Sequence, residues 1–202
     1  MSAGVKAQLF VGGNFGFSST GGSDKVGNTT VDAPSTRNFN LSPMAGYYLT
    51  PKMAVGVELN FNTGKSVTPG TPEIVDKTNS FGIAPFLRYH AISFNKFSVF
   101  AQAGVGFSIS SAKTDVGSTS TDGPKNTSFG FGVSPGISYE LNERFALETS
   151  INILSINYSL STTKEGSGAT EEVTKRSGFN IGAGLDNVVN VGNITIGAIY
   201  KF

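Results

Sequence analysis

The chain has 202 residues, which fits one domain spanning residues 1–202, and only 14% of them are charged, with a formal net charge of +1. This balance argues against a nucleic-acid partner, because the sequence has no basic stripe. The absence of cysteine excludes disulfides and thiol chemistry, and no apolar run approaches the ~18 residues of a membrane helix.

Eight segments of alternating large apolar and small or polar residues follow one another along the chain. In the third, for example, the odd-numbered residues from Met53 to Phe61 are large and apolar, whereas the even-numbered residues between them are small or polar. Such alternation predicts β-strands, because successive strand residues point to opposite faces. The predicted strands are Val5–Ser18, Arg37–Leu49, Met53–Thr63, Asn79–His90, Phe97–Ser110, Thr127–Leu141, Arg144–Tyr158 and Ser177–Phe202.

The connections between these segments alternate in length. Short ones centre on residues 50–52, 91–96 and 142–143. The long ones are rich in Gly, Ser, Thr and Asp, and are expected to be loops; they are Ser19–Thr36, Gly64–Thr78, Ser111–Asn126 and Ser159–Arg176. Long connections at one end and short turns at the other are typical of a membrane-spanning barrel.

The two faces of the predicted strands differ in charge. Glu58, Arg88, Glu148 and Lys201 all fall on the face that carries Gly, Ser and Asn. A Lys or Arg facing lipid at mid-bilayer costs about 2–4 kcal/mol. We therefore expect the large apolar face to meet lipid and the small polar face to fill the lumen.

Three segments carry Pro followed by Tyr four residues later. The tyrosines lie near the short turns on the predicted lipid face, where an interfacial aromatic girdle belongs. The predicted girdle consists of Tyr47, Tyr89, Tyr139 and Tyr200. Proline cannot donate to a strand ladder, so Pro43, Pro85 and Pro135 should each mark a bulge or a missing hydrogen bond.

The chain ends on an alternating strand, Asn193 to Phe202, whose last residue is aromatic. With the hairpin pattern, this ending resembles the small outer-membrane β-barrel proteins of Bacteroidetes-type bacteria, often grouped as porin-like. The resemblance implies an all-β, eight-stranded, antiparallel, up-and-down transmembrane β-barrel in the bacterial outer membrane. It also implies Phe202 as a C-terminal assembly signal, outer-membrane lipid as a partner and the barrel-assembly machinery as a partner during insertion.

Two features depart from a simple pattern. No signal peptide is visible at Met1–Gly4, so we take the chain to be a mature protein whose leader has been removed. The segment Ser177–Phe202 is too long for one crossing, and its alternation changes between Leu185 and Ile194, which leaves a bulge or an extra hairpin open. Leu154 and Ile156 break the alternation in the preceding segment.

The best candidate site is a polar network in the lumen, formed by Glu58, Arg88, Gln102 and Glu148. Buried charges must be paired, so a bridge from Arg88 to Glu58 or to Glu148 is expected. One interpretation is a gate or proton path. We favour the other, in which these side chains simply fill a polar interior, because an eight-stranded barrel is just wide enough for that.

No enzyme is predicted. Gly132–Gly136 matches the pattern G-x-S-x-G around Ser134, but that nucleophile needs a strand-to-helix turn and a neighbouring histidine. The one histidine, His90, falls near a short turn. A lone histidine without cysteine is also a poor metal site, so we expect no catalytic residue, cofactor or metal.

We predict a non-enzymatic barrel with a structural role, or an accessory or interaction subunit of a larger outer-membrane protein complex. One alternative is a narrow porin-like channel for small solutes. Another is a soluble barrel with reversed faces that binds an apolar ligand.

Overall fold

The computed structural model describes residues 9–151, 154–165, 172–183 and 194–202. None of these residues belongs to a helix that is long and apolar enough to cross a membrane. The described residues form ten β-strands, which are β1 (Leu9–Val26), β2 (Thr29–Thr50), β3 (Met53–Thr68), β4 (Ile74–Phe94), β5 (Phe97–Val116), β6 (Thr119–Glu140), β7 (Phe145–Ile151), β8 (Leu154–Glu165), β9 (Glu172–Ala183) and β10 (Ile194–Lys201).

Eight of these strands close into a ring. Strands β1 to β6 each pair antiparallel with the next; β6 then pairs with β7, β7 with β10, and β10 with β1. The predicted eight-stranded antiparallel barrel is therefore confirmed. The ring closes at the end that carries the short turns, which we call the short-turn half.

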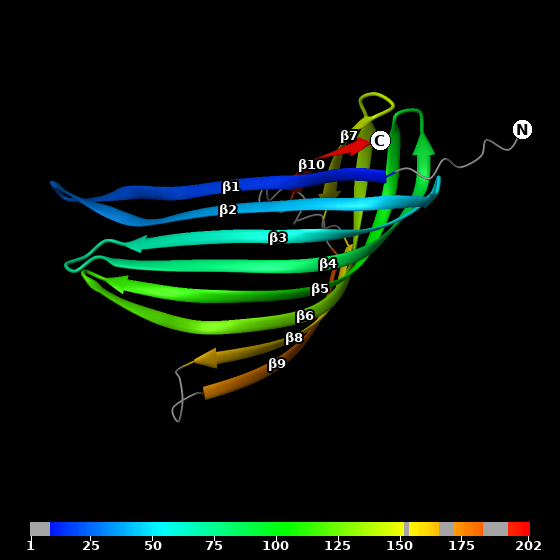
Figure 1. Cartoon of the computed structure of the whole chain (residues 1–202). Coiled ribbons are helices and arrows are strands. Elements are labelled where there is room, and N and C mark those ends of the chain that lie inside the picture. Colours follow the sequence, from blue (N-terminus) through cyan, green and yellow to red (C-terminus); the bar gives the residue numbers. More distant parts are fainter. Residues whose placement is uncertain (1–8, 152–153, 166–171, 184–193) are drawn as a thin grey trace, which may run out of the picture.

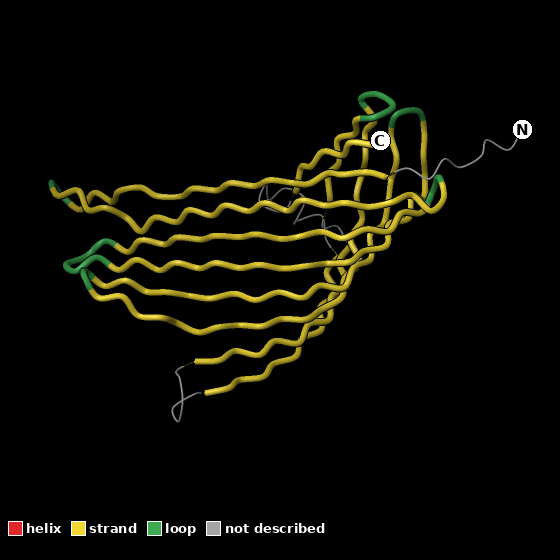
Figure 2. The backbone as a smooth tube through the Cα atoms, in the orientation of Figure 1, coloured by secondary structure: helices red, strands yellow, loops and turns green. Residues whose placement is uncertain are grey.

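The opposite half, which we call the hairpin half, contains the long ends of β1 to β6 together with β8 and β9 (Figure 1). Here β8 pairs with β6 beyond the end of β7, and β9 pairs with β8. The backbone trace in Figure 2 shows how far these strands extend from the short turns.

Large apolar side chains lie mainly on the outer surface. Phe15 and Phe17 of β1 are 59% and 64% exposed, whereas Phe10, on the other face of the same strand, is fully buried. Because side chains alternate along a strand, the face that points away from the ring collects the apolar residues. This is the arrangement that the sequence predicts for contact with lipid.

The segments predicted as long loops are largely strand, and that prediction was wrong. Strands β1 and β2 continue to a turn at residues 27–28, and β5 and β6 to a turn at residues 117–118. Gly27 and Gly117 have φ of +65° and +58°, which glycine adopts without strain. Gly, Ser and Asp suggested loops, but Thr favours strands and the paired hairpins satisfy their own backbone groups.

The other two long connections are also shorter than expected. Only residues 69–73 lie between β3 and β4. Strand β8 reaches Glu165 and β9 starts at Glu172, so most of the predicted loop Ser159–Arg176 is strand; residues 166–171 lie outside the described residues.

Each of the three strand prolines interrupts the pairing with a neighbouring strand, as predicted. Around Pro43, β2 pairs with β3 at Leu41 and again only at Met44. Around Pro85, the pairing of β4 with β5 is likewise missing between Ile83 and Phe86. At Pro135, β6 changes partner from β7 to β8. The missing bonds expected from the sequence are confirmed.

The seventh predicted segment is split into β7 and β8. On β6, Gly136 pairs with Ser150 of β7, and Val133 pairs with Ile156 of β8. Three residues along β6 therefore correspond to six residues along the neighbouring chain segment. An odd excess exchanges the two faces: Leu147 of β7 and Leu160 of β8 are both exposed, although one number is odd and the other even. The alternation therefore breaks between these two residues, as the sequence predicts, whereas the side chains of Leu154 and Ile156 are not among those described. The eighth segment comprises part of β9 and all of β10, and the change predicted around Asp186–Asn190 lies outside the described residues.

Candidate functional site

Three phenylalanines point into the ring at the short-turn half, and each lies directly across from a glycine. The pairs are Phe10 with Gly46, Phe86 with Gly56, and Phe100 with Gly136. A Cβ atom at Gly56 would stand 2.5 Å from Cζ of Phe86, so the glycine leaves the space that the ring occupies.

Phe10 and Phe86 pack with Met44, Ala54 and Ile199 into a buried apolar cluster. The expectation that small polar side chains fill the lumen is therefore wrong in the short-turn half of the barrel. These residues were missed because they stand singly among small residues on the inner face. An isolated aromatic such as Phe10, two residues before Gly12, is the signal that could have found them.

Arg88 of β4 lies against these rings and is only 2% exposed. Its Nη1 donates to both carboxylate oxygens of Glu148, at 2.8 and 2.7 Å. Its Nε and Nη2 donate to Oε1 of Gln102, at 3.1 and 2.7 Å. The guanidinium carbon stands 4.3 Å from the ring centre of Phe100 and 5.5 Å from that of Phe86.

This ion pair crosses the interior of the ring, because Arg88 lies on β4 and Glu148 lies three strands further round, on β7. Both side chains are buried. A buried charge needs a partner and further hydrogen bonds, and Glu148 and Gln102 supply them. We refer to Phe10, Phe86, Arg88, Phe100, Gln102 and Glu148 as the plug.

Glu58 does not form the bridge that the sequence left open. Ala54 lies directly across from Arg88, so Glu58 stands four residues, or about 13 Å, further towards the hairpin half. Glu58 lines a void of about 30 Å³ together with Arg88, Gln102 and Glu148. The void has room for one or two water molecules. The structure thus joins three of the four predicted residues directly and places the fourth beside them.

The interior is also filled between the plug and the short turns. His90 is buried, with Nδ1 3.1 Å from Oγ of Ser98. Its ring centre lies 5.9 Å from that of Tyr48 and 5.7 Å from that of Phe100. Among the described residues, Nε2 of His90 has no hydrogen-bond partner. This layer of rings extends the filling of the interior from the plug towards the short turns.

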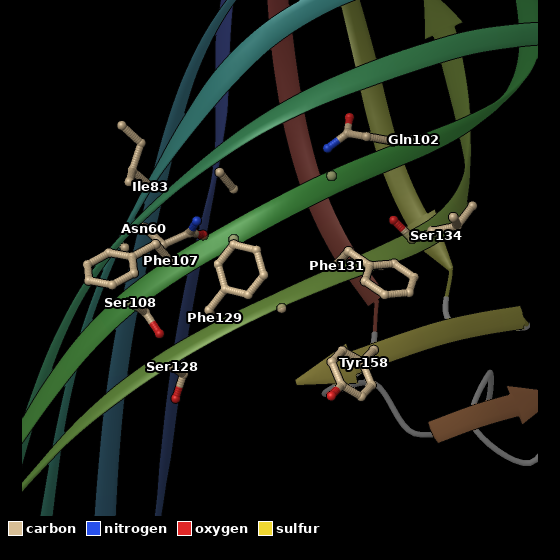
Figure 3. Close-up of a pocket in the computed structure, with 17 residues that line it drawn as sticks. Asn60, Ile83, Gln102, Phe107, Ser108, Ser128, Phe129, Phe131, Ser134 and Tyr158 are labelled. Atoms are coloured by element: carbon tan, nitrogen blue, oxygen red, sulfur yellow. The ribbon is translucent and has the colours of Figure 1, made fainter. Parts of the chain in front are cut away.

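A cavity of about 680 Å³ opens on the hairpin side of the plug (Figure 3). Glycines and small polar inward residues of β3 to β6 make up much of its lining, among them Asn60, Ser108, Ser128 and Ser134. Gln102 lines both this cavity and the small void next to Arg88. The cavity is an open hollow beside the plug, because β9 pairs only with β8 among the described strands and the hairpin half does not close into a ring. Ser134 lines this hollow, whereas His90 lies on the other side of the plug, towards the short turns.

The predicted girdle residues lie near the short turns. Tyr47 and Tyr89 are exposed on the outer face, and the ring of Tyr139 lies 4.6 Å from that of Phe97. Tyr200 packs against Phe202 with ring centres 5.0 Å apart. Their role as a girdle stays a prediction.

The chain end is tied to the first strand. The backbone N–H of Phe202 donates to the carbonyl oxygen of Leu9 at 3.0 Å. The role of Phe202 as an assembly signal stays a prediction. Within the described ranges, no three His, Asp or Glu side chains gather into a possible metal site.

Comparison with known proteins gives one matching family and several similar solved structures. The profile of a family described as outer membrane protein beta-barrel domain matches residues 1–202. No curated protein sequence matches the chain. A major outer membrane protein from Thermus thermophilus is 14% identical, with a TM-score of 0.52 over 98% of this chain and 100% of that chain.

Two further solved structures are similar at lower TM-scores. The outer membrane protein OprG from Pseudomonas aeruginosa is 15% identical, with a TM-score of 0.48 over 97% of this chain and 94% of that chain. The Neisserial surface protein A is 18% identical, with a TM-score of 0.46 over 97% of this chain and 99% of that chain. At such identities the likeness concerns the fold alone.

Proposed function

The chain belongs to the family of outer membrane protein beta-barrel domains and is a protein of the bacterial outer membrane, and from this we propose a non-enzymatic structural or interaction role. In this proposal the barrel is an accessory subunit of an outer-membrane assembly and works through its outer surface and its hairpins. The observation that supports it most is the plug, since a barrel with a filled interior offers its outer surfaces to partners.

The plug opposes the passage of solutes for a physical reason. An eight-stranded barrel has an interior just wide enough for side chains, and here the buried pair Arg88–Glu148 spans that interior between the rings of Phe86 and Phe100. Opening a path requires the separation of two buried charges, which costs several kcal/mol. The chemistry expected of an enzyme also lacks support, because Ser134 and His90 lie in different layers.

A narrow channel is the second candidate, and the cavity of about 680 Å³ favours it. The cavity would be the vestibule, and the void of about 30 Å³ beside Glu58 would be the constriction. In that case a motion of Arg88 or Glu148 would open the path.

The first experiment is a pull-down of the tagged chain from its native outer membrane in mild detergent, followed by mass spectrometry. A tagged barrel of similar size from the same membrane is the control for co-extraction. We expect a partner in stoichiometric amount that the control does not capture. A barrel that comes out alone would overturn the role as an accessory subunit and leave a free-standing structural protein.

The second experiment separates this proposal from the channel. We expect the purified protein to give no steady conductance in a planar lipid bilayer. Stable conductance steps that change when Glu58→Gln is introduced would overturn the plugged barrel and support the channel, because Glu58 lines the narrow void.

A further inference from the structure

Four cationic side chains form a row on the outer face of the hairpin half. Arg37 of β2 lies directly across from Lys65 of β3, Lys65 from Lys77 of β4, and Lys77 from Lys113 of β5. All are exposed. We call Arg37, Lys65, Lys77 and Lys113 the cationic row.

Such a row is unfavourable by itself. Residues directly opposite on neighbouring strands have Cβ atoms about 4.5–5.5 Å apart, and like charges at that spacing repel. The same stretch of the described outer face carries two carboxylates. Asp115 accepts a hydrogen bond from Lys77 at 2.8 Å, and Asp122 lies directly across from Lys113.

Asp115 is fully engaged and stays ionised. The ammonium of Lys77 and the hydroxyl of Ser120 hold the pKa of Asp115 below its usual range. Four cations stand against these two carboxylates, so the row keeps a surplus of positive charge. This surplus attracts anions from outside the chain.

The row lies at the depth of lipid head groups. On the same strands, Phe39, Phe61 and Phe81 are exposed at the edge of the apolar band. Arg37 lies two residues from Phe39, and Lys65 stands four residues from Phe61. At ~3.3 Å per residue and a strand tilt of ~40°, the cations lie roughly 5–10 Å beyond the apolar edge. The head-group layer outside the hydrocarbon is about 5–8 Å thick.

The short-turn half has no comparable arrangement among its described residues. Lys52, Lys96 and Arg144 stand in three different turns, and Arg144 directly follows Glu143. The two ends of the barrel thus differ in how their cations are arranged, although both lie close to an apolar edge. Outer-membrane barrels have short turns on the periplasmic side and longer connections on the extracellular side. The cationic row therefore lies at the end expected to face the outside of the cell.

We propose that the cationic row binds the phosphate groups of phosphorylated lipids in the outer leaflet. Adjacent cations on neighbouring strands can share one phosphate through charge-assisted hydrogen bonds. The acyl chains of the same lipid would lie against Phe39, Phe61 and Phe81 directly beneath. This combination of a cationic row above an apolar band selects a lipid over a free phosphate ion.

The test uses the full chain in phosphatidylcholine vesicles with or without diphosphoryl lipid A. The row variant carries Lys65→Gln, Lys77→Gln and Lys113→Gln, and the control carries Lys52→Gln, Lys96→Gln and Arg144→Gln, which removes the same charge at the other end. We expect the row variant to bind lipid A on the order of a hundredfold more weakly than wild type, and the control to bind like wild type. Asp115→Asn should tighten binding, because it removes a competing carboxylate.

Urea unfolding in the same vesicles gives a second readout. Without lipid A, the row variant should resist urea at least as well as wild type, because repulsion within the row is relieved. With lipid A, it should unfold at lower urea than wild type. Equal lipid A binding by the row variant and the control would overturn the proposal. A rise in the urea midpoint with inorganic phosphate equal to that with lipid A would assign the row to free anions instead.

Discussion

Arg88 carries its charge into the centre of the barrel, where 2% of the residue is exposed. Three neighbours stabilise the buried charge. Glu148 neutralises it, Gln102 accepts two further hydrogen bonds, and the ring centre of Phe100 lies 4.3 Å from the guanidinium carbon. A positive charge over an aromatic face is favourable, and more so away from water. Removing the carboxylate of Glu148 should therefore be costly.

We predict that Glu148→Gln lowers the free energy of unfolding by about 3 kcal/mol. Gln keeps the shape and can accept a hydrogen bond, but it leaves the guanidinium charge without a counter-charge in a buried place. The measurement is urea unfolding in lipid vesicles, followed by tyrosine fluorescence and by the heat-dependent shift in gel migration.

Glu58→Gln is the matched control. Glu58 has the same chemistry but lines the void instead of bridging to Arg88, so the change should cost less than about 1 kcal/mol. Equal losses in the two variants would contradict the assignment of Glu148 as the partner of Arg88.

Neighbouring strands fit together through large and small residues on the inner face. Phe100 of β5 lies across from Gly136 of β6, and Phe10 of β1 lies across from Gly46 of β2. Ile199 of β10 fills the space over Gly12 in the same way. The strands thus need particular glycines where a partner strand supplies a large side chain.

At this scale we predict that Gly136→Ala destabilises the barrel by about 1–3 kcal/mol, whereas Gly106→Ala is nearly neutral. A Cβ atom at Gly136 would stand 2.5 and 2.9 Å from ring carbons of Phe100, so the ring must move away from Arg88. A Cβ atom at Gly106 would meet nothing within 4 Å. The cost follows from overpacking a filled interior.

Urea midpoints of the two variants in the same vesicles test this. A loss at Gly106→Ala as large as at Gly136→Ala would show that glycine is needed for strand flexibility in general. That result would contradict the close fit between Phe100 and Gly136.

The whole molecule has two unlike ends. The short-turn half closes the ring and contains the plug, whereas the hairpin half contains the cavity and, on its outside, the cationic row. This arrangement suits a barrel that is sealed towards one compartment and offers surfaces towards the other. The chain belongs to the family of outer membrane protein beta-barrel domains. Its membership of the Bacteroidetes-type group stays a prediction.

For the whole molecule we predict that the hairpins point out of the cell. The sequence has no cysteine, so Ser118→Cys in the turn between β5 and β6 and Lys96→Cys in the turn between β4 and β5 each give one exposed thiol. A maleimide that cannot cross membranes should label Ser118→Cys on intact cells and leave Lys96→Cys unlabelled. Lys96→Cys should react once the outer membrane is opened. Labelling of Lys96→Cys on intact cells would reverse the orientation.

Much of the fold could be predicted from local patterns. The alternation of residues such as Val55, Gly56, Val57 and Glu58 determined that the chain forms strands and which face is apolar, because side-chain direction along a strand has a period of two and needs no knowledge of neighbours. Pro43, Pro85 and Pro135 likewise indicated interrupted ladders, since the missing N–H is a property of proline itself.

Only the tertiary structure decided what depends on register between strands. The sequence placed Arg88, Glu58 and Glu148 on one face but left the choice of partner open, and closure of the ring brought Glu148 across the interior to Arg88. The Phe–Gly pairs of the plug and the alignment of Arg37, Lys65, Lys77 and Lys113 follow from the same register. Strand pairing and closure set these distances between residues far apart in the sequence, and the period of two along one strand contains no information about them.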